Sequence, residues 1–243
     1  MKINIDISTY VFLLISFLAG YFEYMYILLL IIFIHESGHA LFGMMVGFNK
    51  PTINIYPFGG ITIFNEDLNV RIYKEFISLL GGITFQLLFY LLCLYLYKEL
   101  FITNHVFEII KRVNFLLISF NFMLILPLDG GKLLNIILDY FFSYKVSHII
   151  SIVFSIIFIL LFIYTHNDLF SLIILSFLIK SVIIEAISLR TKYSLFLFER
   201  YKKEYNFKRI KFINSISSFK RDCTHIINNE FEKSILHKLF DRR

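Results

Sequence analysis

The sequence predicts an all-α membrane protein of about six transmembrane helices, with a small β-hairpin or re-entrant loop after the second of them. Hydrophobic residues make up 58% of the 243 residues and charged residues 17%, whereas soluble domains are about 45–50% apolar and about 25% charged. Apolar runs suited to a bilayer core of about 30 Å recur along the chain, and only 10 glycines and 3 prolines interrupt them. This composition excludes disordered, collagen-like and nucleic-acid-binding proteins.

The apolar runs predict the spans in chain order. We expect spans at about residues 10–19, 25–46, 75–97, 113–142, 146–164 and 169–187. The first run is expected to be a span rather than a signal peptide, because Asp6 interrupts its basic end and a longer run follows almost at once. A short turn, His166-Asn167-Asp168, separates the last two spans.

The segment 50–64 differs from the spans around it. It has two short arms rich in β-forming residues on either side of Pro57 and the pair Gly59-Gly60, which predicts a hairpin or a re-entrant loop. An exposed strand edge there can capture an extended peptide by strand addition. On this hypothesis, proline in place of Ile53 and Ile55 removes that edge.

The charge distribution predicts the orientation in the membrane. Residues 190–243 carry 14 of the 24 Lys and Arg but 6 of the 18 Asp and Glu, a net charge of +8. Positive charge beside spans marks the cytosolic side, and with six spans both termini lie there. We therefore expect a six-span core at 1–189 and a basic cytosolic tail at 190–243, near anionic lipid headgroups rather than nucleic acid. Cys93 and Cys223 have no metal-ligand spacing and are expected to be structural.

The second span carries the main chemical signal. His35, Glu36 and His39 place three ionisable groups within five residues of an apolar helix, and such residues inside a membrane are functional by default. At spacing i, i+4 the two imidazoles lie on one helical face and can bind one Zn²⁺. Glu36 can then act as acid and base on a zinc-activated water. The alternative is a pair of polar residues that satisfy one another between helices.

A catalytic zinc site needs a third protein ligand, and Asp129 is the strongest candidate. It lies at the centre of the fourth span, between Pro127 and the pair Gly130-Gly131. Proline removes a backbone donor and glycine permits sharp geometry, so we expect one span with an unwound centre that aims the carboxylate sideways. The alternative role for Asp129 is the N-cap of the helix that follows.

These residues together resemble the site-2 protease family of intramembrane zinc metalloproteases, and within it the members that act in bacterial sporulation. The resemblance rests on residues 33–40 (Phe-Ile-His-Glu-Ser-Gly-His-Ala), on residues 56–61 (Tyr-Pro-Phe-Gly-Gly-Ile), and on Asn121 placed eight residues before Asp129. It implies one zinc ion per chain, held by His35, His39 and Asp129.

The resemblance also implies roles for two further residues. Glu36 is the implied catalytic acid and base, and Asn121 is implied to assist near the active site. Asn121 can orient substrate or donate to a developing oxyanion, and an interhelical hydrogen bond is its alternative role.

The chain departs from the family pattern at three places. Leu124 stands where the family often has a second proline, and Gly81-Gly82 with Gln86 stand where it has a Gly-Pro-x-x-Asn element. The tail is too short for the nucleotide-sensing CBS domain of the sporulation members.

The resemblance implies a membrane-tethered substrate, with a pro-sigma factor as the candidate, and inhibitory membrane partner proteins. It places the protein in the cell membrane as a multi-pass protein, in the mother-cell membrane around the forespore. Formation of a homo-oligomer is left open. The competing class is a membrane metal transporter or channel that uses the same His/His/Asp cluster. Glu36 distinguishes the protease from the transporter, because a transporter needs the metal ligands alone, whereas a protease also needs the carboxylate of Glu36.

Overall fold

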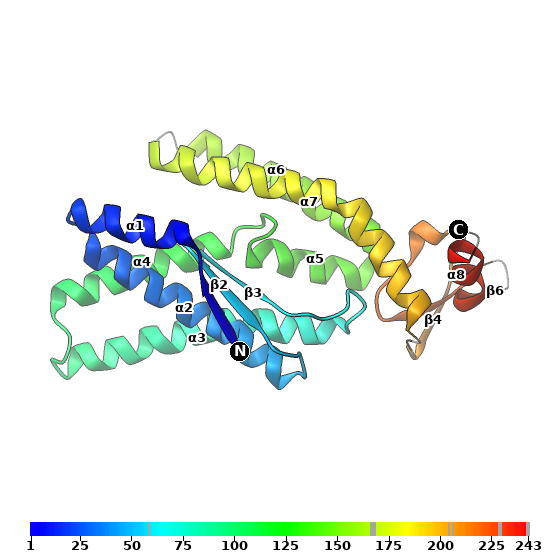
Figure 1. Ribbon diagram of the computed structural model, residues 1–243, viewed down its shortest axis with the longest axis horizontal. Coiled ribbons are helices and arrows are strands. Elements are labelled where there is room, and N and C mark those ends of the chain that lie inside the picture. Colours follow the sequence, from blue (N-terminus) through cyan, green and yellow to red (C-terminus); the bar gives the residue numbers. More distant parts are fainter. Residues whose placement is uncertain (58, 166–168, 204, 206, 228–229, 242–243) are drawn as a thin grey trace. The chain divides into compact units, whose positions relative to one another are not determined.

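The computed structural model describes residues 1–57, 59–165, 169–203, 205, 207–227 and 230–241. The chain is mostly helical and forms two compact units (Figure 1). Unit 1 comprises Met1–Glu66 and Lys74–Asn121, and unit 2 comprises Asp67–Tyr73 and Phe122–Arg243. Each unit is described by itself.

Unit 1 is built around the helix that carries the two histidines. Its helices are α1 (Ile7–Leu18), α2 (Phe22–Met45), α3 (Ile72–Lys98, which begins in unit 2) and α4 (Asn104–Asn121). The middle of α2 is apolar on most sides, which is typical of a helix enclosed by others. Ile31 and Ile32 of α2 are buried in one cluster with Ile110 and Leu117 of α4 and with Cys93 of α3. This packing fixes the centre of α2 inside the unit.

A three-stranded sheet lies beside α2. Its strands are β1 (Lys2–Ile5), β2 (Thr52–Tyr56) and β3 (Gly59–Ile63), in the order β1-β2-β3. The predicted hairpin is confirmed, because β2 and β3 pair antiparallel with Tyr56 opposite Gly59. The parallel strand β1 was not expected. Phe58, in the turn, lies outside the described residues.

The central position of β2 corrects the proline hypothesis. β2 pairs with a strand on each side, and Ile53 and Ile55 are buried in the core of unit 1. Proline at either position would disrupt the sheet and the core rather than remove an exposed edge. Within this sheet the edges are β1 and β3.

Unit 2 contains α5 (Asp129–Phe141), α6 (Tyr144–Thr165) and α7 (Leu169–Lys202). α5 packs on α6, and α6 and α7 lie side by side (Figure 1). The predicted break in the fourth span is confirmed, because residues 122–128 separate α4 from α5. α4 begins at Asn104, nine residues before the expected start of this span at 113. α7 also continues beyond the predicted end at 187, and the predicted turn His166-Asn167-Asp168 lies outside the described residues.

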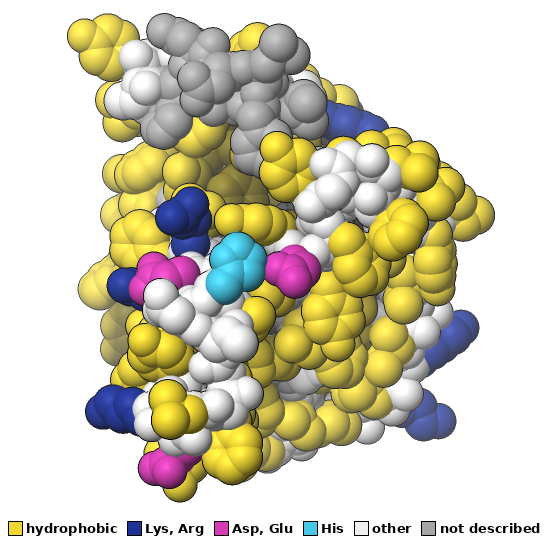
Figure 2. Space-filling view, turned by 90° about the vertical axis from the view of Figure 1, so that its left-hand side faces the viewer, with side chains coloured by type: hydrophobic (Ala, Val, Ile, Leu, Met, Phe, Trp, Pro, Cys, Tyr) yellow, Lys and Arg dark blue, Asp and Glu magenta, His cyan; other side chains and the backbone are white. Residues whose placement is uncertain are grey.

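Three of the described helices, α2, α3 and α6, are long and apolar enough to cross a membrane. Hydrophobic side chains cover most of the face in Figure 2, with few charged groups among them. On α3 and α6 the exposed side chains include Leu88, Leu91, Leu160 and Leu161. Exposed apolar side chains along these two helices fit lipid better than water. α1 has 12 residues and spans about 18 Å, so the count of six spans stays a prediction.

The end of the chain folds into a small subdomain, which we call the C-terminal subdomain (residues 203–241). It contains β4 (Arg209–Phe212), a short 3₁₀ helix (Ile216–Ser218), β5 (Cys223–Ile227), β6 (Glu230–Phe231) and α8 (Glu232–Phe240). The strand order is β4-β5-β6. Phe219 and Leu236 of this subdomain share a buried cluster with Phe196 of α7 and Tyr144 of α6. The predicted tail therefore carries a fold.

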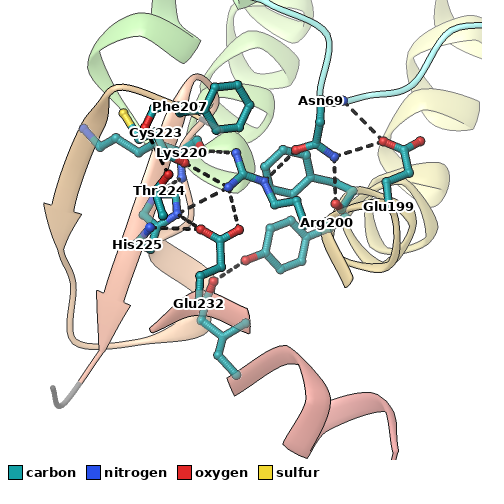
Figure 3. A network of polar contacts seen from close by, with 12 residues as sticks. Asn69, Glu199, Arg200, Phe207, Lys220, Cys223, Thr224, His225 and Glu232 are labelled. Carbon is teal, nitrogen blue, oxygen red and sulfur yellow. Dashed lines mark hydrogen bonds and ion pairs between the residues drawn. The ribbon is translucent and has the colours of Figure 1, made fainter. Parts of the chain in front are cut away.

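A buried arginine holds the C-terminal subdomain to α7 (Figure 3). The side chain of Arg200 is 1% exposed. Its guanidinium donates to Asn69 Oδ1 at 2.6 Å, to Glu232 Oε1 at 2.8 Å and to the Lys220 carbonyl at 2.8 Å. A buried charge is tolerated only when it is paired and its donors are satisfied. This network therefore requires all of its members at once.

The C-terminal subdomain should loosen in mild acid, because His225 is buried within it. Lys220 N–H donates to His225 Nε2 at 3.0 Å, and His225 Nδ1 lies 3.0 Å from Glu232. Burial lowers the pKa of His225 below its ordinary value of 6.5, although Glu232 acts in the opposite direction. The unfolded chain therefore binds the proton first, so this contribution to stability is complete above about pH 6.5 and is lost as the pH falls.

Hydrogen exchange of β5 and α8, corrected for the intrinsic pH dependence, should accelerate between pH 7 and pH 5. The variant His225→Asn should lack this acceleration, while His237→Asn, at an exposed histidine of α8, should keep it. Equal protection of the native protein at both pH values would contradict the assignment.

Candidate metal centre

The histidine motif lies in the middle of α2 and is buried. One ligand atom from each of His35, Glu36 and His39 lies within 4.8 Å of the others. The predicted placement of both imidazoles on one helical face is therefore confirmed, with the two rings at 86° and their centroids 4.7 Å apart. A cluster of this composition within an apolar helix has the donor types that Zn²⁺ selects.

Hydrogen bonds from α3 fix which nitrogen of each ring carries a proton. His39 Nδ1 lies 3.0 Å from the Ser78 carbonyl oxygen, which can only accept, so Nδ1–H donates. His35 Nδ1 lies 2.9 Å from Gln86 Oε1. The Gln86 amide nitrogen donates to the Asn114 carbonyl at 3.3 Å, which turns its oxygen toward His35. In the neutral form of each ring, Nε2 is then the atom that carries the lone pair.

The two Nε2 atoms face each other at 3.0 Å. Two lone pairs at this distance repel unless a cation or a proton lies between them. Nitrogens about 2.0–2.1 Å from a tetrahedral zinc ion lie about 3.3 Å apart, close to the observed separation. Metal-ligating histidines almost always donate their other N–H to an oxygen, as both rings do here. His35 and His39 thus fit a zinc ion as they stand.

The strand β3 holds Glu36 in place. The Thr62 hydroxyl lies 2.7 Å from Glu36 Oε2 and 3.1 Å from the Glu36 carbonyl oxygen. A Cβ atom built on Gly60 would lie 2.3 Å from Glu36 Cγ, so glycine lets the strand pass this closely. One carboxylate oxygen is therefore fixed by a hydrogen bond, and the side chain is confined between α2 and β3.

Asn121, the last residue of α4, also reaches the cluster. Its Nδ2 lies 3.3 Å from His35 Nε2, so the amide can donate to the lone pair of that nitrogen. The predicted position of Asn121 near the histidines agrees with this contact. The contact does not decide between substrate orientation and an interhelical hydrogen bond.

Asp129 is the first residue of α5 in unit 2. It is buried, and an oxygen of its carboxylate lies 3.6 Å from Lys132 Nζ. Leu128, not Asp129, holds the N-cap position of α5, and it makes no side-chain capping bond. The alternative role of Asp129 as the N-cap is therefore wrong, while its role as a metal ligand stays a prediction.

Three residues that orient the motif had no role predicted from the sequence. Ser78 and Gln86 come from α3 and Thr62 from β3, at least 26 residues beyond Glu36 along the chain. Gln86 gave a signal, because it is a buried amide in an otherwise apolar span. Gly82 lies one helical turn before Gln86 on α3. A Cβ atom at this position would lie 2.4 Å from His39 Nε2, so only glycine leaves space for the imidazole rings.

Replacing Gln86 should weaken zinc binding. Gln86→Leu removes the acceptor that holds His35 in the required tautomer, and the loss of such a partner lowers metal affinity about 10–100-fold. Gln86→Glu keeps an oxygen there and should lose less. A zinc titration against a competing chelator measures both variants, and native affinity in Gln86→Leu would show that the contact does not matter.

Known proteins include a relative of this chain and a structure that resembles it. No protein-family model matches the chain. The chain is 29% identical over 134 residues to stage IV sporulation protein FB of Bacillus subtilis (strain 168), a match that covers 55% of this chain and 46% of that protein. It thus spans less than half the length of this relative. The site-2 protease from Methanocaldococcus jannaschii has a similar structure, with a TM-score of 0.53 and 20% identity over 80% of this chain and 90% of that one. The likeness to this solved structure shows the fold, which is that of the site-2 protease.

Proposed function

We propose that the chain is a zinc-dependent intramembrane metalloprotease that cleaves a membrane-tethered protein. The observation that carries this proposal is the pair of buried Nε2 atoms, 3.0 Å apart on an apolar helix, with Glu36 beside them. Two histidines that only satisfied one another would share a proton, with one ring donating. Here both Nδ1 atoms face an oxygen of α3, which turns both Nε2 atoms toward one point, as two ligands of one ion require.

Asp129 completes the proposed ligand set with His35 and His39. It is a buried carboxylate at the start of α5, and the non-helical residues 122–128 separate it from α4. Three protein ligands with one position left open is the composition of a catalytic zinc site. When bound, zinc supplies a Lewis acid that activates water and polarises a carbonyl group.

Glu36 is the proposed acid and base. Its carboxylate accepts a proton from the attacking water as the water oxygen bonds to the scissile carbonyl carbon, and it returns that proton to the amine as the C–N bond breaks. The hydrogen bond from Thr62 to Oε2 leaves Oε1 for this transfer. The amide of Asn121 can donate to the carbonyl oxygen as it gains negative charge.

The edge of β3 offers a place for the substrate. A transmembrane helix hides its carbonyl groups in its own hydrogen bonds, so the substrate must be extended to be cut. β3 is an edge strand of its sheet, and its Thr62 contacts Glu36. A segment added to this edge by strand pairing would lie beside the carboxylate. Ile61 and Ile63 point to the other face and are exposed.

The biological substrate is proposed from the relative and from the sequence resemblance. The similarity to stage IV sporulation protein FB supports a role in sporulation, with a pro-sigma factor as the candidate substrate and inhibitory membrane proteins as partners. On this proposal the protein lies in the mother-cell membrane with both termini in the cytosol.

The direct test is co-expression with candidate membrane-tethered precursors. Glu36→Gln should bind zinc as the native protein does and lose cleavage by roughly 10²–10⁴-fold, because the acid and base is gone. Asp129→Asn should lose both zinc affinity and cleavage.

Cleavage of the precursor by Glu36→Gln at the native rate would contradict the proposed mechanism. The transporter alternative predicts instead that both the native protein and Glu36→Gln carry zinc into sealed vesicles and that neither cleaves a precursor.

Strand pairing of the substrate should show in a proline scan of a cleaved precursor. An extended segment alternates the direction of its N–H groups with a period of two, and proline cannot donate to a ladder. The rate of cleavage should therefore decrease when proline is placed at every second position around the scissile bond. Proline far from the bond serves as the control. A uniform effect at all neighbouring positions would exclude pairing with β3.

A further inference from the structure

Four consecutive residues of the C-terminal subdomain, 219–222, each contact a different part of unit 2. The Phe219 carbonyl oxygen accepts from Tyr144 N–H at 3.0 Å, at the start of α6. The Lys220 ammonium donates to the Phe141 carbonyl, at the end of α5. We call these four residues the clamp segment.

Arg221 makes the buried part of this contact. Its side chain is 4% exposed and that of Asp139, on α5, is 0% exposed. Arg221 donates from NH1 to Asp139 Oδ2 at 3.2 Å and from NH2 to the Val70 carbonyl at 2.6 Å. Asp222 Oδ2 accepts from Ile72 N–H at 3.0 Å, at the first residue of α3. The clamp segment thus joins α5 to the linker 67–73, which connects β3 to α3.

Arg200 of α7 and His225 of β5 hold the main chain of the clamp segment (Figure 3). Arg200 donates to the carbonyl oxygens of Lys220 and Cys223, and His225 accepts from Lys220 N–H. The main chain at Asp222 has a φ of 51°, a left-handed conformation that few residues adopt. The segment is therefore held in one conformation by the fold around it.

Serines of α6 hold α5 and the segment just before it. Ser147 donates to Asp139, Ser151 Oγ lies 3.2 Å from Asn135 Oδ1, and Ser155 Oγ accepts from Leu126 N–H at 2.9 Å. All three serines are buried. Because a helix is stiff over its about 15 Å from Asp139 to Asp129, the position of its last turn fixes that of its first residue.

We propose that Arg221 is a positioning residue, through which the C-terminal subdomain sets the place of α5 and so of Asp129. The proposal rests on the proposed function in one respect, the role of Asp129 as a zinc ligand. Buried ion pairs often add little net stability compared with apolar residues of similar size. A pair with fixed geometry does specify one arrangement of the two elements, which is what a metal ligand at the far end of α5 requires.

The test uses the full chain in detergent micelles with the variants Arg221→Gln, Asp139→Asn and their combination. Lys208→Gln, at an exposed lysine of the same subdomain, is the matched control. Hydrogen exchange of residues 129–141 should accelerate in both single variants and not in the control. Zinc affinity should fall about tenfold or more, as for other residues that orient ligands, and the double variant should be no worse than Arg221→Gln because the two act as a pair.

A conservative variant separates positioning from simple folding. Arg221→Lys can still reach Asp139 but lacks the second donor for Val70, so it should recover part of the zinc affinity. With a cleaved precursor, Arg221→Gln should lower kcat by about the same factor as zinc affinity and leave KM within about twofold. If Arg221→Gln does not fold, Arg221→Lys and Asp139→Asn carry the same comparison.

The proposal is overturned if exchange in the Arg221 variants rises only within residues 203–241 while α5 and zinc affinity stay native. The exchange and zinc measurements need no protease activity. If the native protein cleaves nothing while these measurements behave as expected, the proposed function fails and the positioning role stands.

Discussion

The candidate metal centre depends on one contact, the two imidazole nitrogens of α2 that face each other at 3.0 Å. Each ring is oriented by an oxygen at its Nδ1 atom, His39 by the Ser78 carbonyl and His35 by the side chain of Gln86. Helix α3 therefore does more than pack against α2, because it supplies both oxygens that orient the rings.

The same arrangement explains why a strand lies against the motif. β3 passes Glu36 closely enough to require glycine at position 60 and places the Thr62 hydroxyl on the carboxylate. The free side of β3 is an edge of the sheet. A single short strand thus holds the proposed acid and base, and in the proposed function its edge would also pair with the substrate.

The sequence predicted the features that are local and failed on those that arise from tertiary contacts. The i, i+4 histidines, the hairpin at Pro57 and the break around Pro127 all follow from short-range geometry. Gln86 and Ser78 act only because α3 packs beside α2. β1 is four residues long and is a strand only because it pairs with β2. The largest failure concerns the basic tail, in which Arg200 and Arg221 were counted as surface charge. Both are buried, since carboxylates and carbonyl groups from distant segments surround them.

The central claim is that His35 and His39 bind one zinc ion together through their Nε2 atoms. X-ray absorption at the zinc edge of the purified protein measures this directly. The account predicts one zinc per chain, with two imidazole nitrogens and oxygen donors in its shell, and one imidazole fewer in His39→Asn. A native shell without imidazole, or a shell unchanged in His39→Asn, would contradict it.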